Sequence, residues 1–204
     1  MSFQEEQDKI VKNLNGVESL LLHSCCGPCS SYCIEALSEY FEVTVLWYNS
    51  NIHPQSEYDL RLENQKKLIS NIETKNPVHL LELEYDPESY FDLVRGLENE
   101  PEGGKRCTQC FIQRLERAAK ETKERGFNWF TTTLTVSPHK NAPLINEIGN
   151  TMAERYGVRF LPSDFKKRNG YKRSIELSKM YDLYRQNYCG CIYSIRGENK
   201  DCNI

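Results

Sequence analysis

The sequence contains no long hydrophobic run, and nothing in its 204 residues approaches the roughly 18 consecutive apolar residues of a membrane-spanning helix. Its first ten residues, MSFQEEQDKI, are acidic and polar, whereas a secretory signal peptide begins with basic and then hydrophobic residues. The first absence excludes a spanning helix, and the second argues against secretion. We therefore expect a cytoplasmic protein without membrane contact.

Cysteine is too scarce for a protein built on disulfide bonds. The nine cysteines fall below the share of roughly 8–10% that is typical of disulfide scaffolds, and their number is odd. In a reducing compartment, cysteines at short spacing are more often metal ligands or redox catalysts than crosslinks. The positions of the cysteines are therefore more informative than their number.

The formal net charge of -3 hides an uneven distribution of charge along the chain. Residues 82–102 include eight acidic residues and one arginine, whereas residues 165–200 include nine Lys or Arg and three acidic residues. A basic segment of this kind can follow nucleic-acid phosphates, although a solvated helix face has the same composition.

Short apolar runs alternate with helical periodicity along the chain, which predicts an α/β fold. We expect a single domain, residues 1–204, with a mainly parallel sheet flanked by helices in a Rossmann-like or HUP-like arrangement, completed by the basic segment 165–204. The predicted strands are 18–24, 41–49, 78–85, 128–136 and 158–162. The predicted helices are 29–40, 54–72, an acidic helix up to about 97, 106–125 and 141–156 with glycine caps at 126 and 157, and 174–184.

Seven of the cysteines form three short groups. They are Cys25, Cys26 and Cys29 in CCGPC, Cys107 and Cys110 in CTQC, and Cys189 and Cys191 in CGC. The first group follows the first predicted strand, so we expect a metal site at the carboxyl ends of the strands, where sites of such sheets form. Thiolates suit zinc and iron-sulfur clusters alike, but four ligands complete a structural zinc site, and the surplus favours iron-sulfur.

The CGC tripeptide has a different character, because glycine allows the backbone to bend and a disulfide between its cysteines would be strained and easily reduced. It predicts a redox-active pair, with binding of a second metal ion as the alternative. We assign no function to Cys33, a small core residue, or to Cys202, near the chain terminus.

Polar residues near the predicted site supply further candidates. Ser137, His139 and Lys140 lie in a loop before a helix, where they can bind a phosphate or a base edge. His139 and Asp164 are candidate acid-base groups, and His23 either donates a hydrogen bond to a sulfur or packs in the core. The segment SDFKKRNGYKR interleaves basic and aromatic residues, a composition typical of RNA binding and also of solvated loops.

Six motifs, in this order and spacing, resemble the QueH family of epoxyqueuosine reductases. They are HSCCGPCS, YNSNIHPQSEYDLR, KRCTQCFIQRLE, TTTLTVSPHKN, DFKK and YRQNYCGCIYS, and they cover positions 23 to 194. One residue departs from the family pattern: Ser50 stands where related chains have proline, which bears on the stiffness of that loop.

The resemblance implies reduction of epoxyqueuosine to queuosine at the wobble position of tRNA, the last step of queuosine synthesis, without cobalamin. It implies that a four-iron four-sulfur cluster is bound by Cys25, Cys26, Cys107 and Cys110, with Cys189 and Cys191 as the redox pair. A second, mononuclear iron would be bound by Cys29 or by a CGC thiol. The candidate tRNA-binding residues are Tyr58, Arg61, Lys140, Lys166, Lys167 and Arg185. The electron donor is not identified by the sequence.

Two other functions fit parts of the same pattern. The first is a zinc-stabilised tRNA-binding module without catalysis, which would use the thiolates structurally. The second is a sulfur-inserting tRNA enzyme that activates its base with ATP. CCGPCS occupies the position after the first strand where a glycine-rich phosphate loop would lie, which counts against the second function.

Overall fold

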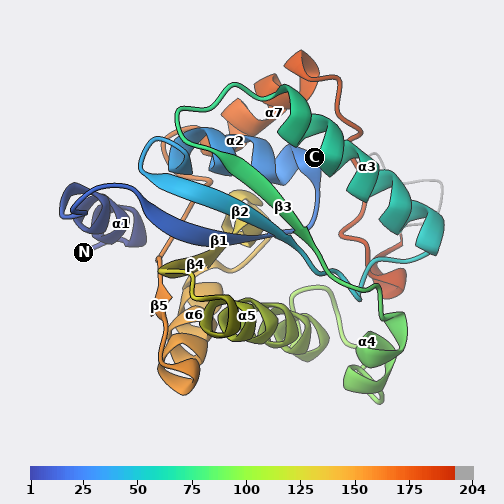
Figure 1. The fold of residues 1–204 in the computed structure, drawn as a ribbon. Coiled ribbons are helices and arrows are strands. Elements are labelled where there is room, and N and C mark those ends of the chain that lie inside the picture. Colours follow the sequence, from blue (N-terminus) through green and yellow to red (C-terminus); the bar gives the residue numbers. More distant parts are fainter. Residues whose placement is uncertain (196–204) are drawn as a thin grey trace.

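The computed structural model describes residues 1–195, so Cys202 and the end of the basic segment lie outside the described residues. Five parallel strands form one sheet in the order β3-β2-β1-β4-β5 (Figure 1). This order is that of a doubly wound α/β sheet, which confirms the predicted fold class. The strands are β1 (Glu18–Ser24), β2 (Phe41–Trp47), β3 (Val78–Glu82), β4 (Trp129–Thr132) and β5 (Arg159–Phe160).

Helices cover both faces of the sheet (Figure 1). One face carries α2 (Gly27–Leu37), α3 (Gln55–Asn71) and α7 (Gly170–Met180), and the other carries α5 (Lys105–Arg125) and α6 (Ala142–Tyr156). The remaining helices are α1 (Phe3–Lys12), α4 (Pro87–Leu93) and two 3-10 turns, η1 (Thr133–Val136) and η2 (Ile192–Ser194). No helix within residues 1–195 has the length and apolar character needed to cross a bilayer.

The central strand β1 contributes side chains to the hydrophobic core on each face of the sheet, because successive side chains point to opposite faces. Leu20 and Leu22 pack with residues of α2 and α3 on one face. Leu21 packs with residues of α5 and α6 on the other face. All three leucines are fully buried, so the end of β1 is held rigidly where the CCGPC loop begins.

The fourth strand is shorter than predicted, and this changes the approach to the site. β4 ends at Thr132 rather than at residue 136, and the chain continues as η1. The hydroxyl of Thr132 accepts the N–H of Leu134 at 3.2 Å, which caps the 3-10 turn. Threonines favour strands by propensity, but here a side chain competes with the sheet for the backbone N–H.

Other elements differ from the prediction as well. β2, β3 and β5 end at residues 47, 82 and 160 rather than at 49, 85 and 162. The helix α1 was not predicted, although Ser2 and Glu5 form a capping box at its start. The last helix runs over 170–180 rather than 174–184, and a Cβ at Gly170 would lie 1.9 Å from the carbonyl oxygen of Phe165, so only glycine fits at its first residue. The acidic helix α4 ends at residue 93 instead of 97. The predicted left-handed glycine caps of α5 and α6 are confirmed.

Close packing of α6 on β5 generates a stability prediction. A Cβ at Gly149 would lie 2.4 Å from Cζ of the buried Phe160 ring. We expect Gly149→Ala to lower the free energy of unfolding by about 1–3 kcal/mol, measured by urea denaturation, because the ring has to move within a packed core. Thr151→Ala, at an exposed position of the same helix, should change it by less than about 0.5 kcal/mol. Equal effects of the two substitutions would contradict this account of the packing.

Candidate functional site

The CCGPC loop joins β1 to α2 at the carboxyl edge of the sheet. Cys26 is the N-cap of α2, and its sulfur accepts the backbone N–H of Cys29 at 3.4 Å. The side-chain amide of Gln186 donates to the same sulfur at 3.0 Å. A Cβ at Gly27 would lie 3.1 Å from the carbonyl oxygen of Asn64, so this glycine lets α2 approach α3 closely.

A buried hydrogen-bond network fixes the start of this loop. The hydroxyls of Ser24 and Ser30 both donate to Oε1 of Gln65, at 2.9 and 2.7 Å. The amide of Asn49, just after β2, donates to the carbonyl oxygen of Ser24 at 2.8 Å. These residues are nearly or fully buried, so the cysteine loop is tied to β2 and α3 by interactions that water cannot replace.

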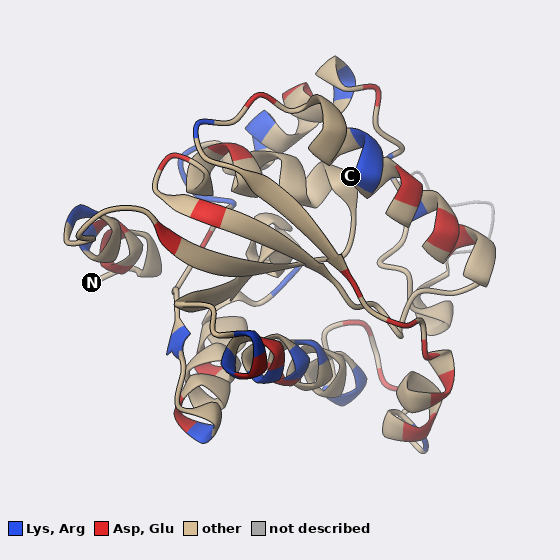
Figure 2. Ribbon diagram, in the orientation of Figure 1, with Lys and Arg blue, Asp and Glu red and all other residues tan. Residues whose placement is uncertain are grey.

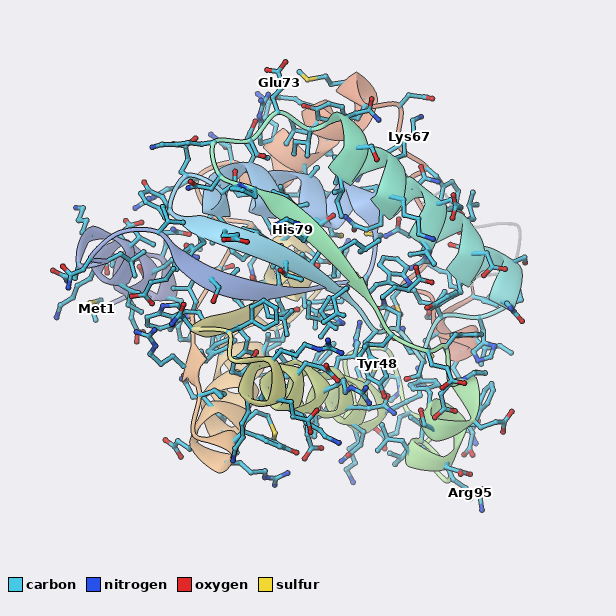
Figure 3. All side chains as sticks on the ribbon, in the orientation of Figure 1. Met1, Tyr48, Lys67, Glu73, His79 and Arg95 are labelled. Carbon is cyan, nitrogen blue, oxygen red and sulfur yellow. The ribbon has the colours of Figure 1, made fainter. Side chains whose placement is uncertain are left out.

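His23, two residues before Cys25, connects the ends of neighbouring strands through its two ring nitrogens. Its two ring nitrogens lie 3.0 Å from Oγ1 of Thr132 and 3.3 Å from the carbonyl oxygen of Tyr48. Tyr48 follows β2 at the carboxyl edge of the sheet (Figure 3). Complete burial lowers the pKa of His23 to about 3, so the ring is neutral and joins the ends of β1, β2 and β4. Both nitrogens are occupied by these oxygens, so the predicted hydrogen bond to a sulfur is not formed.

The sulfurs of Cys25, Cys26 and Cys29 all lie within 4.8 Å of one another. Hydrogen bonds from the other two thiols lower the pKa of Cys25 well below the ordinary thiol value, and the charges of Lys140 and Arg114 act in the same direction. The interaction with Cys25 raises the pKa of Cys26 to about 11. The three sulfurs are thus close enough together to hold a metal ion.

Two adjoining cavities open beside this group. The larger has a volume of about 320 Å³ and is bordered by Cys25, Cys29 and Cys189. The smaller has a volume of about 80 Å³ and is bordered by Cys107, Cys110, Cys189 and Cys191. Both linings include Cys189 together with Glu102, His139, Lys140 and Ser194. Segments that are far apart in the chain therefore meet at the carboxyl edge of the sheet, where the loop after β1 lies.

The CTQC group lies in the first two turns of α5. The sulfur of Cys107 accepts the N–H of Gly103 at 3.2 Å. Cys110 is buried against Cys191 and Tyr90, and burial raises the pKa of its thiol to about 12. Within residues 1–195, only Cys25, Cys26 and Cys29 form a group of three or more ligands within 4.8 Å, so the predicted quartet with Cys107 and Cys110 is not assembled at that spacing.

The CGC loop is held by a buried arginine on α3. Nη1 and Nη2 of Arg61 donate to the carbonyl oxygens of Cys189 and Tyr188 at 3.2 and 3.1 Å. Nε donates to Glu57 at 2.7 Å, and the guanidinium lies over the ring of Tyr188. Gly190 has a φ of +107°, and a Cβ there would lie 3.0 Å from Nη1 of Arg61. The glycine is needed for both the backbone conformation and the close approach of the arginine.

The two CGC thiols have different surroundings. Cys189 is half-buried, borders both cavities, and its sulfur lies 3.2 Å from the hydroxyl of Ser194. Cys191 is 4% exposed, and its sulfur lies 2.9 Å from the hydroxyl of Tyr90. All eight cysteines within the described residues are free, so the CGC pair is a dithiol, and its redox activity stays a prediction.

Comparison with known proteins adds to this geometry. A family model described as "Epoxyqueuosine reductase QueH" matches residues 20–197. The chain belongs to the QueH family. This confirms the resemblance seen in the six motifs.

Named QueH proteins align along most of the chain. The chain is 48% identical over 185 residues to the epoxyqueuosine reductase QueH of Streptococcus pyogenes serotype M1, with 90% of the chain and 72% of that protein covered. It is 45% identical to the protein of the same name from Staphylococcus epidermidis, with 89% and 78% covered. For the Staphylococcus aureus protein, the identity is 41%, with 95% and 85% covered.

The candidate acid-base groups of this QueH chain are placed differently from one another. His139 is exposed and borders both cavities. Asp164 borders neither cavity, and a carboxylate oxygen lies 3.0 Å from Nζ of Lys166. The structure therefore brings His139 to the cysteines and leaves Asp164 in an ion pair outside both linings.

The candidate tRNA-binding residues separate into two sets. Lys140 and Arg185 border the larger cavity, Lys167 is exposed, and Lys166 is half-buried and pairs with Asp164. Tyr58 and Arg61 are 4% and 1% exposed and contact other parts of the protein, so their positions do not support direct contact with tRNA. The reason is visible in the sequence pattern, because Tyr58 lies on the apolar stripe of α3 that packs on the sheet.

Much of the basic segment is used internally. Arg168 pairs with Asp8 of α1, and Arg173 pairs with Glu35 of α2 at 2.6 Å. These ion pairs dock α7 and its preceding loop onto the rest of the protein. Acidic residues, in contrast, are concentrated on α4 and on the chain that leads to it (Figure 2).

Several groups that support the cysteine site were not among the residues predicted from the sequence. Gln186 and Tyr90 hydrogen-bond to sulfurs, and Arg106 donates to the carbonyl oxygens of Leu97, Glu98 and Glu100. Arg106 and Gln186 lie within motifs that carried the family resemblance, KRCTQC and YRQNYCGC. Their polar side chains next to cysteines were the available signal.

The contacts of Arg61 generate a prediction. In Arg61→Lys, one ammonium cannot serve two carbonyl oxygens and Glu57 together, so the CGC loop should loosen. We expect the free energy of unfolding to fall by about 1.5–3 kcal/mol, measured by chemical denaturation. We also expect faster alkylation of Cys189, followed by mass spectrometry. Arg125→Lys, an exposed member of an ion pair on α5, is the control and should change neither quantity. Native alkylation kinetics in Arg61→Lys would rule out the clamp.

Proposed function

We propose that this chain is an oxidoreductase that converts the epoxide of epoxyqueuosine in tRNA to the alkene of queuosine, independently of cobalamin. The observation that carries the proposal is the cavity of about 320 Å³ with Cys25, Cys29 and Cys189 in its lining, in a chain of the QueH family. The reaction consumes two electrons and two protons and releases the epoxide oxygen as water. Because its substrate is tRNA, we place the reaction in the cytoplasm.

The donor set fits an iron-sulfur cofactor. Seven soft thiols from two loops and the start of α5 border or adjoin the two cavities, which exceeds what one structural metal ion requires. We propose Cys25, Cys26, Cys107 and Cys110 as ligands of a four-iron four-sulfur cluster, and Cys29 or a CGC thiol as a ligand of a second iron. When bound, such a cofactor supplies single electrons and Lewis acidity.

The residues around the larger cavity suit a modified nucleobase. Tyr171 and Tyr188 offer aromatic faces for stacking, and Arg185, Gln186 and Asn187 offer hydrogen-bonding groups. Extruding a base from an RNA loop into such a cavity is the usual way for an enzyme to reach it. These lining residues support the proposal that the base lies in this cavity beside the thiols.

A proton source is available on the exposed side of the cavity. His139 follows η1 and borders both cavities, so we propose that it delivers a proton to the epoxide oxygen. Lys140, Lys167 and Arg185 are proposed to bind the phosphates of the tRNA. The electrons come from an external reductant that the chain does not itself contain.

The cofactor proposal is tested with Cys107→Ala. Removing this thiol should lower the iron content and lower conversion of epoxyqueuosine to queuosine by at least a hundredfold, measured by mass spectrometry of nucleosides from digested tRNA. Cys33→Ala is the matched control, because Cys33 is fully buried in the hydrophobic core and borders neither cavity. It should retain conversion. Full conversion by Cys107→Ala would refute the ligand assignment.

The colour of the native protein separates this function from a zinc-stabilised binding module. Protein purified without oxygen should be brown, with iron and sulfide present by chemical analysis. Colourless protein that contains zinc and binds tRNA without converting the base would refute the enzymatic proposal.

A further inference from the structure

Arg114 is a buried cation at the centre of the cysteine site. It lies on α5, one turn after Cys110, and is 4% exposed. Its Nε donates to the carbonyl oxygen of Cys110 at 3.2 Å, and its guanidinium lies 5.7 Å from the ring of Phe111. The side chain borders the smaller cavity together with four cysteines.

No carboxylate within residues 1–195 forms an ion pair with Arg114. The other buried arginines of the site have hydrogen-bond or ion-pair partners within the protein. Arg61 pairs with Glu57, and Arg106 donates to three carbonyl oxygens. Nη1 and Nη2 of Arg114 have no hydrogen-bond acceptor among the described residues. A buried charge without an opposite charge costs several kcal/mol, so this arrangement calls for an anion in the adjacent space.

The groups that face Arg114 identify that anion. The thiols of Cys110, Cys25 and Cys189 interact electrostatically with its guanidinium, and the hydroxyl of Tyr90 does so more weakly. These residues come from all three cysteine groups. Lys140, from the loop after η1, faces Cys25, Cys189 and Cys29 in the same way. Arg114 and Lys140 thus both face Cys25 and Cys189, and Arg114 is fixed there by a hydrogen bond and by aromatic packing.

We propose that Arg114 is a positioning residue that balances the negative charge of the metal-thiolate cofactor and raises its reduction potential. This inference rests on the iron-sulfur cofactor of the proposed function. A thiolate-bound iron-sulfur cluster becomes more negative on reduction, so a fixed positive charge favours the reduced state. In a buried site, water and salt screen that charge only weakly, which makes a single guanidinium effective.

The experiment compares three variants after anaerobic reconstitution with iron and sulfide. Arg114→Gln removes the positive charge, and Arg114→Lys keeps the charge but lacks the planar guanidinium. Arg117→Gln is the control, because it removes a charge from the same helix at a position that is 36% exposed and paired with Glu121. The readouts are the iron and sulfide content and the midpoint potential, obtained by redox titration followed by electron paramagnetic resonance.

We expect Arg114→Gln to lower the equilibrium constant for one-electron reduction at least tenfold, which corresponds to a shift of about 59 mV to more negative potential. Arg114→Lys should retain most of the native potential, and Arg117→Gln should match the native protein. A native potential in Arg114→Gln overturns the inference. If Arg114→Gln takes up no iron but Arg114→Lys does, the charge is needed to hold the cofactor, which supports the inference. If neither variant takes up iron, the shape of the guanidinium is required rather than its charge, which overturns the inference.

The two proposals fail in different ways. Native protein that takes up iron and converts epoxyqueuosine, with a potential insensitive to Arg114→Gln, leaves the proposed function intact and removes the role of Arg114. Native protein that takes up no iron overturns the cofactor and the inference together.

Discussion

Buried arginine side chains hold the cysteine site together. Arg61, Arg106 and Arg114 are all nearly inaccessible to water, and each contacts a different segment around the two cavities. Arg61 fixes the CGC peptide, Arg106 fixes the acidic segment before α5, and Arg114 faces the thiols. A guanidinium has five donors in a rigid plane, so one buried side chain can orient two or three backbone carbonyls. These interactions hold irregular loops at defined positions around the two cavities.

The parallel sheet explains why three remote cysteine groups can meet at all. The CCGPC loop follows β1, the central strand, and η1 with the His139 loop follows its neighbour β4. The CTQC group is brought in by α5, which packs on one face of β1 and β4, and the CGC group is brought in by Arg61 of α3 on the opposite side. The site is therefore bounded by elements from both layers of helices, and neither layer alone could form it.

The sequence predicted the fold class and most elements because their signals are local. Apolar periodicity identified α5, α6 and all five strands, and Gly126 and Gly157 marked the helix ends. The shortened β4 and the ion pair of Asp164 with Lys166 come from side chains that contact groups two residues away, which composition and periodicity do not reveal. The burial of Arg61 depends on contacts with the distant Tyr188 and Cys189. Composition cannot distinguish an arginine that binds RNA from one that binds a carbonyl oxygen inside the protein. That distinction requires the tertiary structure.

The grouping of the thiols also indicates how the ligands could be divided. Cys25, Cys26 and Cys29 are close enough together to share one metal ion, whereas the remaining four thiols border the smaller cavity beside Arg114. A cluster of several irons spreads its thiolates more widely than a single ion does, because inorganic sulfide and iron lie between them. Cys25 faces Arg114 as Cys110 does, so it belongs electrostatically to both sets. A ligand set that includes Cys25 and the CTQC thiols therefore agrees with the charge distribution. Cys29 and Cys189 are outside that set, and both border the larger cavity proposed for the base.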